Sequence, residues 1–97
     1  MATRQVIISG RIKDATTDNG IQDALIRAYD WYGQQWVELN ARSDANGYHR
    51  IVLDLEVSAD DKVYVYIEVT KPGYSASTKN AWTRTNRMRK YFSLIPV

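Results

Sequence analysis

The stretch Val63-Tyr-Val-Tyr-Ile-Glu-Val-Thr70 decides the fold class of this chain. Its odd-numbered positions are all apolar and β-branched, whereas its even-numbered positions hold two tyrosines, a glutamate and a threonine. Successive side chains of a strand point to opposite faces, so this alternation predicts a strand with one face in a core. Lys71-Pro-Gly-Tyr74 follows and ends the strand, because proline cannot continue a ladder and glycine permits a sharp turn.

The same alternation recurs along the rest of the chain. It predicts strands over residues 6–13, 24–31, 36–43, 48–55, 75–85 and 88–95, most of them separated by turn-forming residues. Within 48–55 the alternation slips at Arg50 and Ile51, which predicts a bulge or an early end of the strand there. Seven short strands spaced by about ten residues predict an antiparallel β-sandwich. We expect its core to contain Ile8, Ile12, Ile26, Leu39, Val65, Ile67, Phe92 and Leu94.

Length and composition restrict the function. The 97 residues are enough for a single domain over residues 1–97. The chain has no cysteine and one histidine, which excludes disulfides, cysteine nucleophiles and zinc sites with several histidines. No apolar run approaches the roughly 18 residues of a membrane span, so we expect no membrane insertion. We therefore predict that the protein is not an enzyme and has no catalytic residues, cofactor or metal.

Three small groups of residues are candidates for a chemical site. His49 could act as a base, but no serine or cysteine lies at a sequence spacing from it that would indicate a nucleophile–base pair. We therefore expect a strand histidine that faces solvent. Calcium could be bound by Asp14 with Asp18 and Asn19, or by Asp44 with Asn46. Neither set fits the twelve-residue calcium loop, and Asp and Asn are common in turns for local reasons.

The order of the turns resembles a known family. Gly10-Arg-Ile-Lys-Asp14, Gly20-Ile21 and Ala24-Leu-Ile26 are similar to the opening of carboxypeptidase regulatory-like domains. Asp44-Ala-Asn-Gly-Tyr48 and Lys71-Pro-Gly-Tyr74 resemble two later turns of that family, so the likeness covers roughly residues 6–74. The resemblance implies a seven-stranded prealbumin-like, or immunoglobulin-like, sandwich. It also implies a non-catalytic module appended to a larger surface, secreted or particle-associated protein.

Two related families match less well. The B-type repeats of Gram-positive surface adhesins join a lysine and an asparagine through an isopeptide bond. Here Ile12 stands where that lysine would be, and no asparagine follows Asn86, so we expect no such bond. Hydroxyisourate hydrolases share an N-terminal histidine and a C-terminal Tyr-Arg-Gly-Ser, neither of which is present.

The aromatic residues indicate a binding surface. If the second strand pairs with the third and the fifth, one outer sheet face gathers five rings: Tyr29, Trp31, Trp36, Tyr64 and Tyr66. Exposed aromatic clusters anchor proteins or stack on sugars. We predict a structural or adhesive module whose face contacts a protein partner or a second copy of the chain. The alternative is a carbohydrate-binding module that uses the same rings for a polysaccharide, and a one-residue register slip would send the rings inward.

Charge is distributed unevenly along the chain. Residues 1–68 carry 7 basic and 11 acidic side chains, whereas residues 69–97 carry 6 basic side chains and no acid. Arg84, Arg87, Arg89 and Lys90 could form a basic patch that faces an anionic partner. The alternative is that these cations protect exposed strands against edge-to-edge pairing. The basic stretch over residues 82–90 contains a single aromatic residue, Trp82, and no RNA-recognition motif, which argues against nucleic-acid binding. We expect an extracellular, cell-surface or phage-particle location, although the chain shows no secretory signal.

Overall fold

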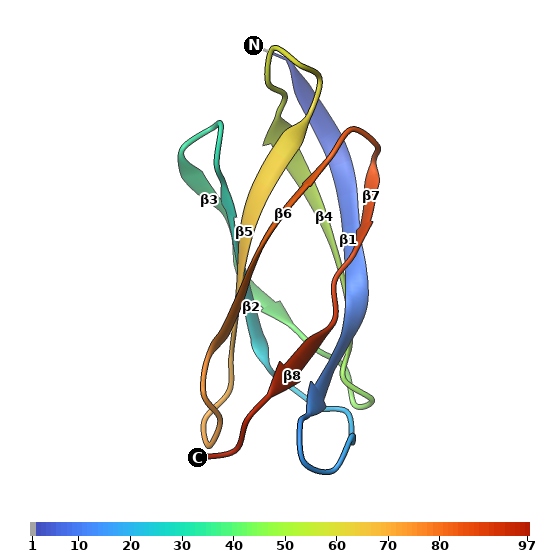
Figure 1. Ribbon diagram of the computed structural model, residues 1–97, viewed down its shortest axis with the longest axis vertical. Helices are drawn as coiled ribbons and strands as arrows, with labels where there is room; N and C mark the ends of the chain where they lie inside the picture. The colour runs from blue at the N-terminus through green and yellow to red at the C-terminus, as the bar shows by residue number, and fades with distance from the viewer. Residues whose placement is uncertain (1) are drawn as a thin grey trace.

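The computed structural model describes residues 2–97, and the stretch over residues 63–70 forms strand β5 with the predicted bounds. Its valines and isoleucine are buried, and its even-numbered side chains are half-buried. Among the described residues there are eight strands and no helix (Figure 1). The strands are β1 (Thr3–Asp14), β2 (Leu25–Asp30), β3 (Gln35–Arg42), β4 (Tyr48–Glu56), β5 (Val63–Thr70), β6 (Ser77–Thr83), β7 (Arg87–Arg89) and β8 (Phe92–Leu94).

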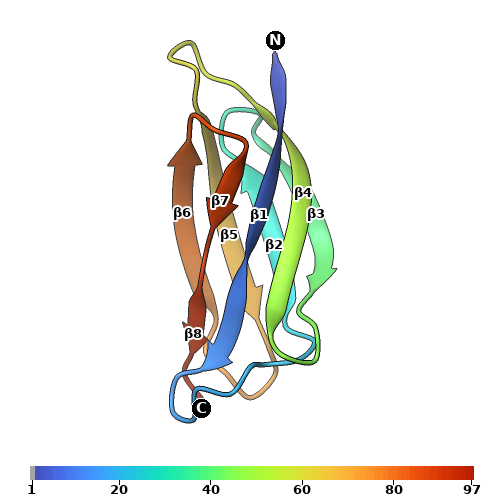
Figure 2. The same cartoon turned by 90° about the vertical axis from the view of Figure 1, so that its right-hand side faces the viewer.

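The strands form two sheets that pack face to face, which confirms the predicted β-sandwich. One, the β5 sheet, has the antiparallel order β3-β2-β5-β6, so β2 pairs with both β3 and β5 as expected. The other, the β1 sheet, has the order β4-β1-β7, with β8 also paired to β1. Figure 2 looks onto this second sheet. The molecule measures 42 × 19 × 18 Å.

The final predicted strand is divided, which is why the structure has eight strands rather than seven. Both β7 and β8 pair with β1 in a parallel direction, so the sandwich is not wholly antiparallel. Ile8 lies opposite Met88 and Ile12 opposite Phe92, so one register continues through both short strands. Between them the backbone of Lys90 crosses Gly10 so closely that a Cβ at Gly10 would collide with the Lys90 carbonyl oxygen. A side chain larger than glycine would therefore not fit at position 10.

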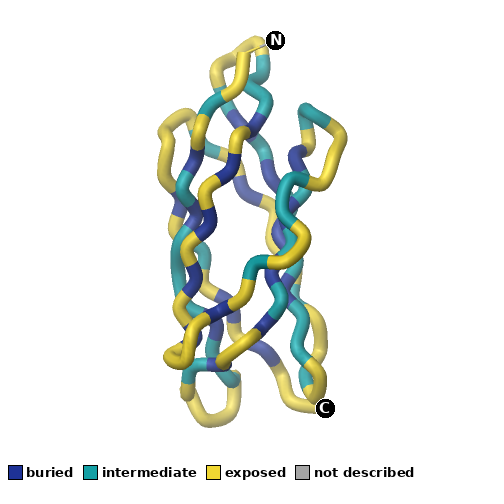
Figure 3. Tube along the Cα trace, turned by 180° about the vertical axis from the view of Figure 1, so that it is seen from behind, coloured by how far each residue is buried: buried dark blue, intermediate teal, exposed yellow. Residues whose placement is uncertain are grey.

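The core lies between the sheets, where Figure 3 shows buried positions alternating with exposed ones. Seven of the eight predicted core residues are buried, but the prediction for Leu39 is wrong, because this side chain is 49% exposed. The ladder between β2 and β3 shifts register on both sides of the Ala28–Glu38 pair. Between Glu38 and Ala41, β3 has one more residue than the facing segment of β2, so the alternation assumed for Leu39 does not hold.

Strand β4 corrects two further predictions. Its pairing with β1 is continuous from Tyr48 to Glu56, so neither the bulge nor the early end expected at Arg50 and Ile51 occurs. Its burial alternates regularly, with His49 inward and Val52 outward. A polar residue at an inward position and an apolar one at an outward position produced the apparent slip. His49 is therefore only 4% exposed and does not face solvent as predicted.

Candidate functional site

The five predicted rings gather on the outer surface of the β5 sheet, and Trp82 joins them. Strand pairing places them in two rows across the sheet, which together we call the aromatic face. In one row Tyr29 lies between Trp36 and Tyr66. In the other, Tyr64 lies opposite Trp82, and its carbonyl oxygen accepts a hydrogen bond of 3.0 Å from the Trp31 amide. The register slip that would have buried these rings does not occur.

The rings pack edge to face rather than as a flat platform. The Tyr29 and Trp36 ring centres are 5.3 Å apart with planes at 72°, and Trp36 meets Tyr66 at 6.3 Å and 71°. Trp31 meets Tyr64 at 5.7 Å and 49°. Tyr32, which follows Trp31 in the turn after β2, adds a contact of 6.4 Å and 75° with Tyr64. Such pairs add roughly 0.5–1.5 kcal/mol each beyond area burial, so the cluster holds its own shape.

Cations lie against the tryptophans at both edges of the aromatic face. The Arg27 guanidinium is 4.1 Å from the ring centre of Trp36, and it forms an ion pair of 3.1 Å with Glu68. At the opposite edge, Lys62 and Arg84 lie 5.3 Å and 5.2 Å from the Trp82 ring. The sequence placed Trp82 in the basic stretch. The signal that assigns it to this face is its even-numbered position in a strand that pairs with β5.

Much of the aromatic face remains open to solvent. Trp31 is 57% exposed, Trp82 53% and Trp36 39%. A shallow hollow of about 170 Å³ lies at one end, lined by Tyr29, Trp31 and Gln34. Large exposed apolar clusters are uncommon on monomeric proteins and mark binding surfaces.

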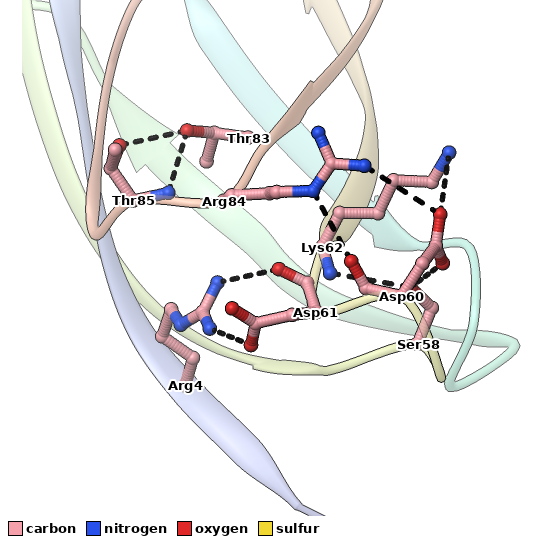
Figure 4. A network of polar contacts seen from close by, with 8 residues as sticks. All are labelled: Arg4, Ser58, Asp60, Asp61, Lys62, Thr83, Arg84 and Thr85. Carbon is pink, nitrogen blue, oxygen red and sulfur yellow. Dashed lines mark hydrogen bonds and ion pairs between the residues drawn. The ribbon is translucent and has the colours of Figure 1, made fainter.

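The predicted basic patch is divided in the structure. Arg84 lies near the β4–β5 turn, where its Nε donates to the Asp60 carbonyl oxygen at 3.2 Å (Figure 4). Asp60 also pairs with Lys62 at 3.5 Å, and the hydroxyl of Ser58 donates to its carboxylate, which lowers the pKa of Asp60. Arg87 and Arg89 instead point outward from β7 on the other sheet, and Lys90 follows them at the Gly10 crossing. The four residues therefore do not form one patch.

In the two turns that are candidate calcium sites, the carboxylates of Asp14 and Asp44 already accept hydrogen bonds from nearby groups. Asp14 accepts from the Thr16 and Thr17 amides and from the Tyr74 hydroxyl at 2.8 Å, and the Tyr74 contact is the main cause of its lowered pKa. One carboxylate oxygen of Asp44 accepts from the amides of Asn46 and Tyr48, both at 2.9 Å. In residues 2–97 no group of three or more His, Cys, Asp or Glu side chains could hold a metal ion.

His49 is placed in the core, where its ring centre lies 6.1 Å from that of Phe92. Neither ring nitrogen has a hydrogen-bond partner among residues 2–97. Burial lowers the pKa of His49 below its ordinary 6.5, because the charged ring would lose its hydration. A neutral ring that contacts the core and not a cleft is poorly placed to act as a base on a substrate.

Comparison with known proteins supports the fold only. No family model matches the sequence, and neither does any curated protein. Among solved structures, the chain is similar to 3-chlorocatechol 1,2-dioxygenase from Rhodococcus opacus 1CP, with a TM-score of 0.70 and 12% identity. The alignment covers 99% of this chain and 61% of the dioxygenase. At this identity the likeness shows a similar sandwich fold and nothing about function. In the described part of the chain, no helix could span a membrane.

Proposed function

We propose that this chain is a non-catalytic structural or adhesive module that docks through its aromatic face onto a protein partner or a second copy of itself. One observation carries the proposal: three tryptophans, each at least 39% exposed, are contiguous on one sheet face with tyrosines between them. Tryptophan, tyrosine and arginine are the residues that dominate binding energy at protein interfaces. Arg27, Lys62 and Arg84 supply the cationic part of that composition.

The ring geometry favours a protein partner over a flat sugar chain. Neighbouring ring planes are inclined to one another by 49° to 75°, which prevents adjacent rings from presenting their faces together, as a platform for successive sugars would require. The Arg27 guanidinium also lies over the Trp36 ring. A protein surface can fill such edges and steps with side chains of its own, because interface cores pack as tightly as protein interiors.

The setting we propose for this module is a larger assembly, such as a surface protein, a phage particle or a secretion apparatus. The resemblance of residues 6–74 to carboxypeptidase regulatory-like domains supports it, since those domains are appended modules. The sandwich also presents the aromatic face and the β1 sheet on opposite sides, so one side can dock while the other remains free (Figure 1).

The test replaces two exposed tryptophans together, in the variant Trp31→Ser with Trp82→Ser. Both side chains are more than half exposed, so we expect the variant to fold. Light scattering over a concentration series should show that the parent chain self-associates and that the variant does so at least tenfold more weakly. The matched control is Tyr48→Ser on the β1 sheet, which is 54% exposed and should leave association unchanged. If the parent is monomeric throughout, the self-docking form is wrong, and cross-linking to the neighbouring components of its assembly tests the partner form.

A carbohydrate-binding module remains the second candidate, and the hollow beside Tyr29, Trp31 and Gln34 favours it. Two rings and an amide are the groups that hold a single sugar unit. A neutral polysaccharide array distinguishes the candidates. Retention of the parent on a neutral glycan, lost in Trp31→Ser while self-association and partner cross-linking persist, would replace the docking proposal with this one.

A further inference from the structure

The outer surface of the β1 sheet carries arginines that strand pairing brings together from two distant parts of the sequence. Strand β1 lies between β4 and β7 (Figure 2). Its Ser9 lies opposite Arg50 of β4 on one side and Arg89 of β7 on the other. Strands are about 4.8 Å apart, so the two arginine backbones are roughly 10 Å apart with a serine hydroxyl between them. Arg87 lies two residues before Arg89 on β7, beside Ile7. We call Arg50, Arg87 and Arg89 the arginine row.

These cations have no carboxylate partners in the part of the chain that the structure describes. Among residues 2–97, none of the three arginines forms an ion pair, and all three are exposed. The nearest acid along the outward side of β4 is Asp54, four residues beyond Arg50 and opposite Gln5. Unpaired arginines spaced along one flat face create a local positive potential although the whole chain carries only +2.

A pocket of about 380 Å³ continues this surface toward β8. Its lining includes the rings of Tyr48 and Tyr91, which are 54% and 55% exposed. Arg11, Lys13 and Ser93 supply its charged and hydroxyl groups. This volume is within the range of small-ligand sites and suits one ring-sized group with its substituents.

Contacts with the rest of the fold hold the pocket walls in place. The Arg11 guanidinium lies 5.7 Å from the Tyr48 ring centre, and its Nε donates to the Asn46 carbonyl oxygen at 3.1 Å. Asp44 accepts from the Tyr48 amide, which fixes the start of β4. Lys79 reaches from β6 and donates to the Tyr91 carbonyl oxygen, so the backbone of the second ring is also anchored.

Lys13 is the one cation of the pocket with an acidic partner. Its Nζ lies 2.8 Å from Asp18, whose carboxylate is largely exposed. Exposed pairs of this kind are worth about 0–1 kcal/mol, so an anionic ligand can compete for the lysine. Arg11, by contrast, has no carboxylate partner in residues 2–97. The pocket therefore retains positive charge.

We propose that this pocket and the arginine row form a binding site for an acidic polysaccharide, whose sugars carry carboxylate or sulfate groups. The tyrosine rings pack against the C–H surface of one sugar. Arginine binds carboxylates and sulfates through paired hydrogen bonds, and Ser9 and Ser93 meet sugar hydroxyls. The site lies on the opposite sheet from the aromatic face and is independent of the docking function proposed above.

Other polyanions fit this surface less well. Sites for single-stranded nucleic acid stack successive bases on successive aromatic rings, whereas both rings here lie at one pocket and the row beyond it is arginine, serine and aliphatic. A sheet face is too broad for a duplex groove, which admits a helix or a two-stranded ribbon. An acidic peptide would satisfy the arginines but leave the sugar-sized pocket without an occupant.

The test measures binding of the full chain to four probes of similar length by calorimetry at physiological salt. The probes are an oligogalacturonate, a heparin oligosaccharide, a neutral dextran oligosaccharide and a thymidine oligonucleotide. We expect binding to at least one acidic glycan and none to dextran. The double variant Arg50→Gln with Arg89→Gln should weaken this binding tenfold to a hundredfold, because it removes charge-assisted hydrogen bonds to the anionic groups of the glycan.

Two more variants separate this site from a general attraction to polyanions. Tyr91→Ala removes a pocket wall without changing charge or the Lys79 contact to the main chain, and it should weaken the acidic glycan at least tenfold. Arg84→Gln removes one positive charge near the β4–β5 turn and should leave binding unchanged. The proposal is overturned if no acidic glycan binds, if the oligonucleotide binds as tightly, or if Tyr91→Ala has no effect. Circular dichroism verifies that every variant is folded.

Discussion

The buried histidine makes stability depend on pH in one narrow window. His49 is kept neutral in the folded chain, because burial lowers its pKa below the ordinary value of 6.5. The unfolded chain takes up a proton as pH falls through 6.5, while the folded chain does not, so the stability present above pH 6.5 is lost as pH falls from there toward the folded pKa. One proton changes the free energy of unfolding by at most about 1.4 kcal/mol per pH unit.

The unfolded pKa of His49 also sets an upper limit on the free energy of unfolding that is lost between pH 7.5 and pH 5.5. Because the pKa of His49 in the unfolded chain is the ordinary 6.5, protonation stabilises the unfolded chain by at most about 1.4 kcal/mol over that interval. The variant His49→Leu should lack this loss. It should also be more stable by about 1–3 kcal/mol at pH 7.5, since two nitrogen atoms without partners leave the core.

Urea denaturation of both proteins at pH 7.5, 6.5 and 5.5 measures both effects. His49 is the single histidine, so side-chain titration in this window reports on that residue. Parallel stability profiles for the parent and His49→Leu would refute the reasoning, and so would a less stable variant at pH 7.5. The first result would mean that the imidazole is solvated in the folded state. The second would mean that the ring makes favourable contacts that leucine cannot replace.

Two further predictions concern packing and turns. Ile67→Ala, at a fully buried position of β5, should lower the free energy of unfolding by about 2–5 kcal/mol in urea denaturation. Leu39→Ala, at a half-exposed position, should lower it by well under half as much. Equal decreases in the two variants would contradict the strand faces described above. Gly47→Ala and Gly73→Ala both place alanine at a positive φ, of 83° and 88°, which costs about 1–2 kcal/mol. Only Gly47→Ala also brings a Cβ against the Ile12 carbonyl oxygen, so its thermal midpoint should fall further, and equal midpoints would show that this turn relaxes without strain.

The sequence was most informative where the two faces of a strand differ in polarity. The stretch over residues 63–70 alternates without exception, and its bounds and buried face are as predicted. The prediction of β4 depended on the same rule and was wrong at His49, because there the inward residue is polar while the outward Val52 is apolar. The bulged segment of β3 has no composition signal that marks its extra residue, so the position of Leu39 could not be derived from alternation.

The two candidate surfaces differ in what a sequence can reveal. The aromatic face depends on pairing between β2 and its neighbours, which the sandwich topology predicts, so five of its rings could be identified by residue number. The arginine row depends on register between β1, β4 and β7, where a shift of one residue would turn Arg50 or Arg89 toward the core. Sequence proximity instead grouped Arg89 with Arg84, although Arg84 contacts Asp60 near the β4–β5 turn. A run of basic residues in a β-protein therefore indicates charge, but only the strand register determines which cations share a face.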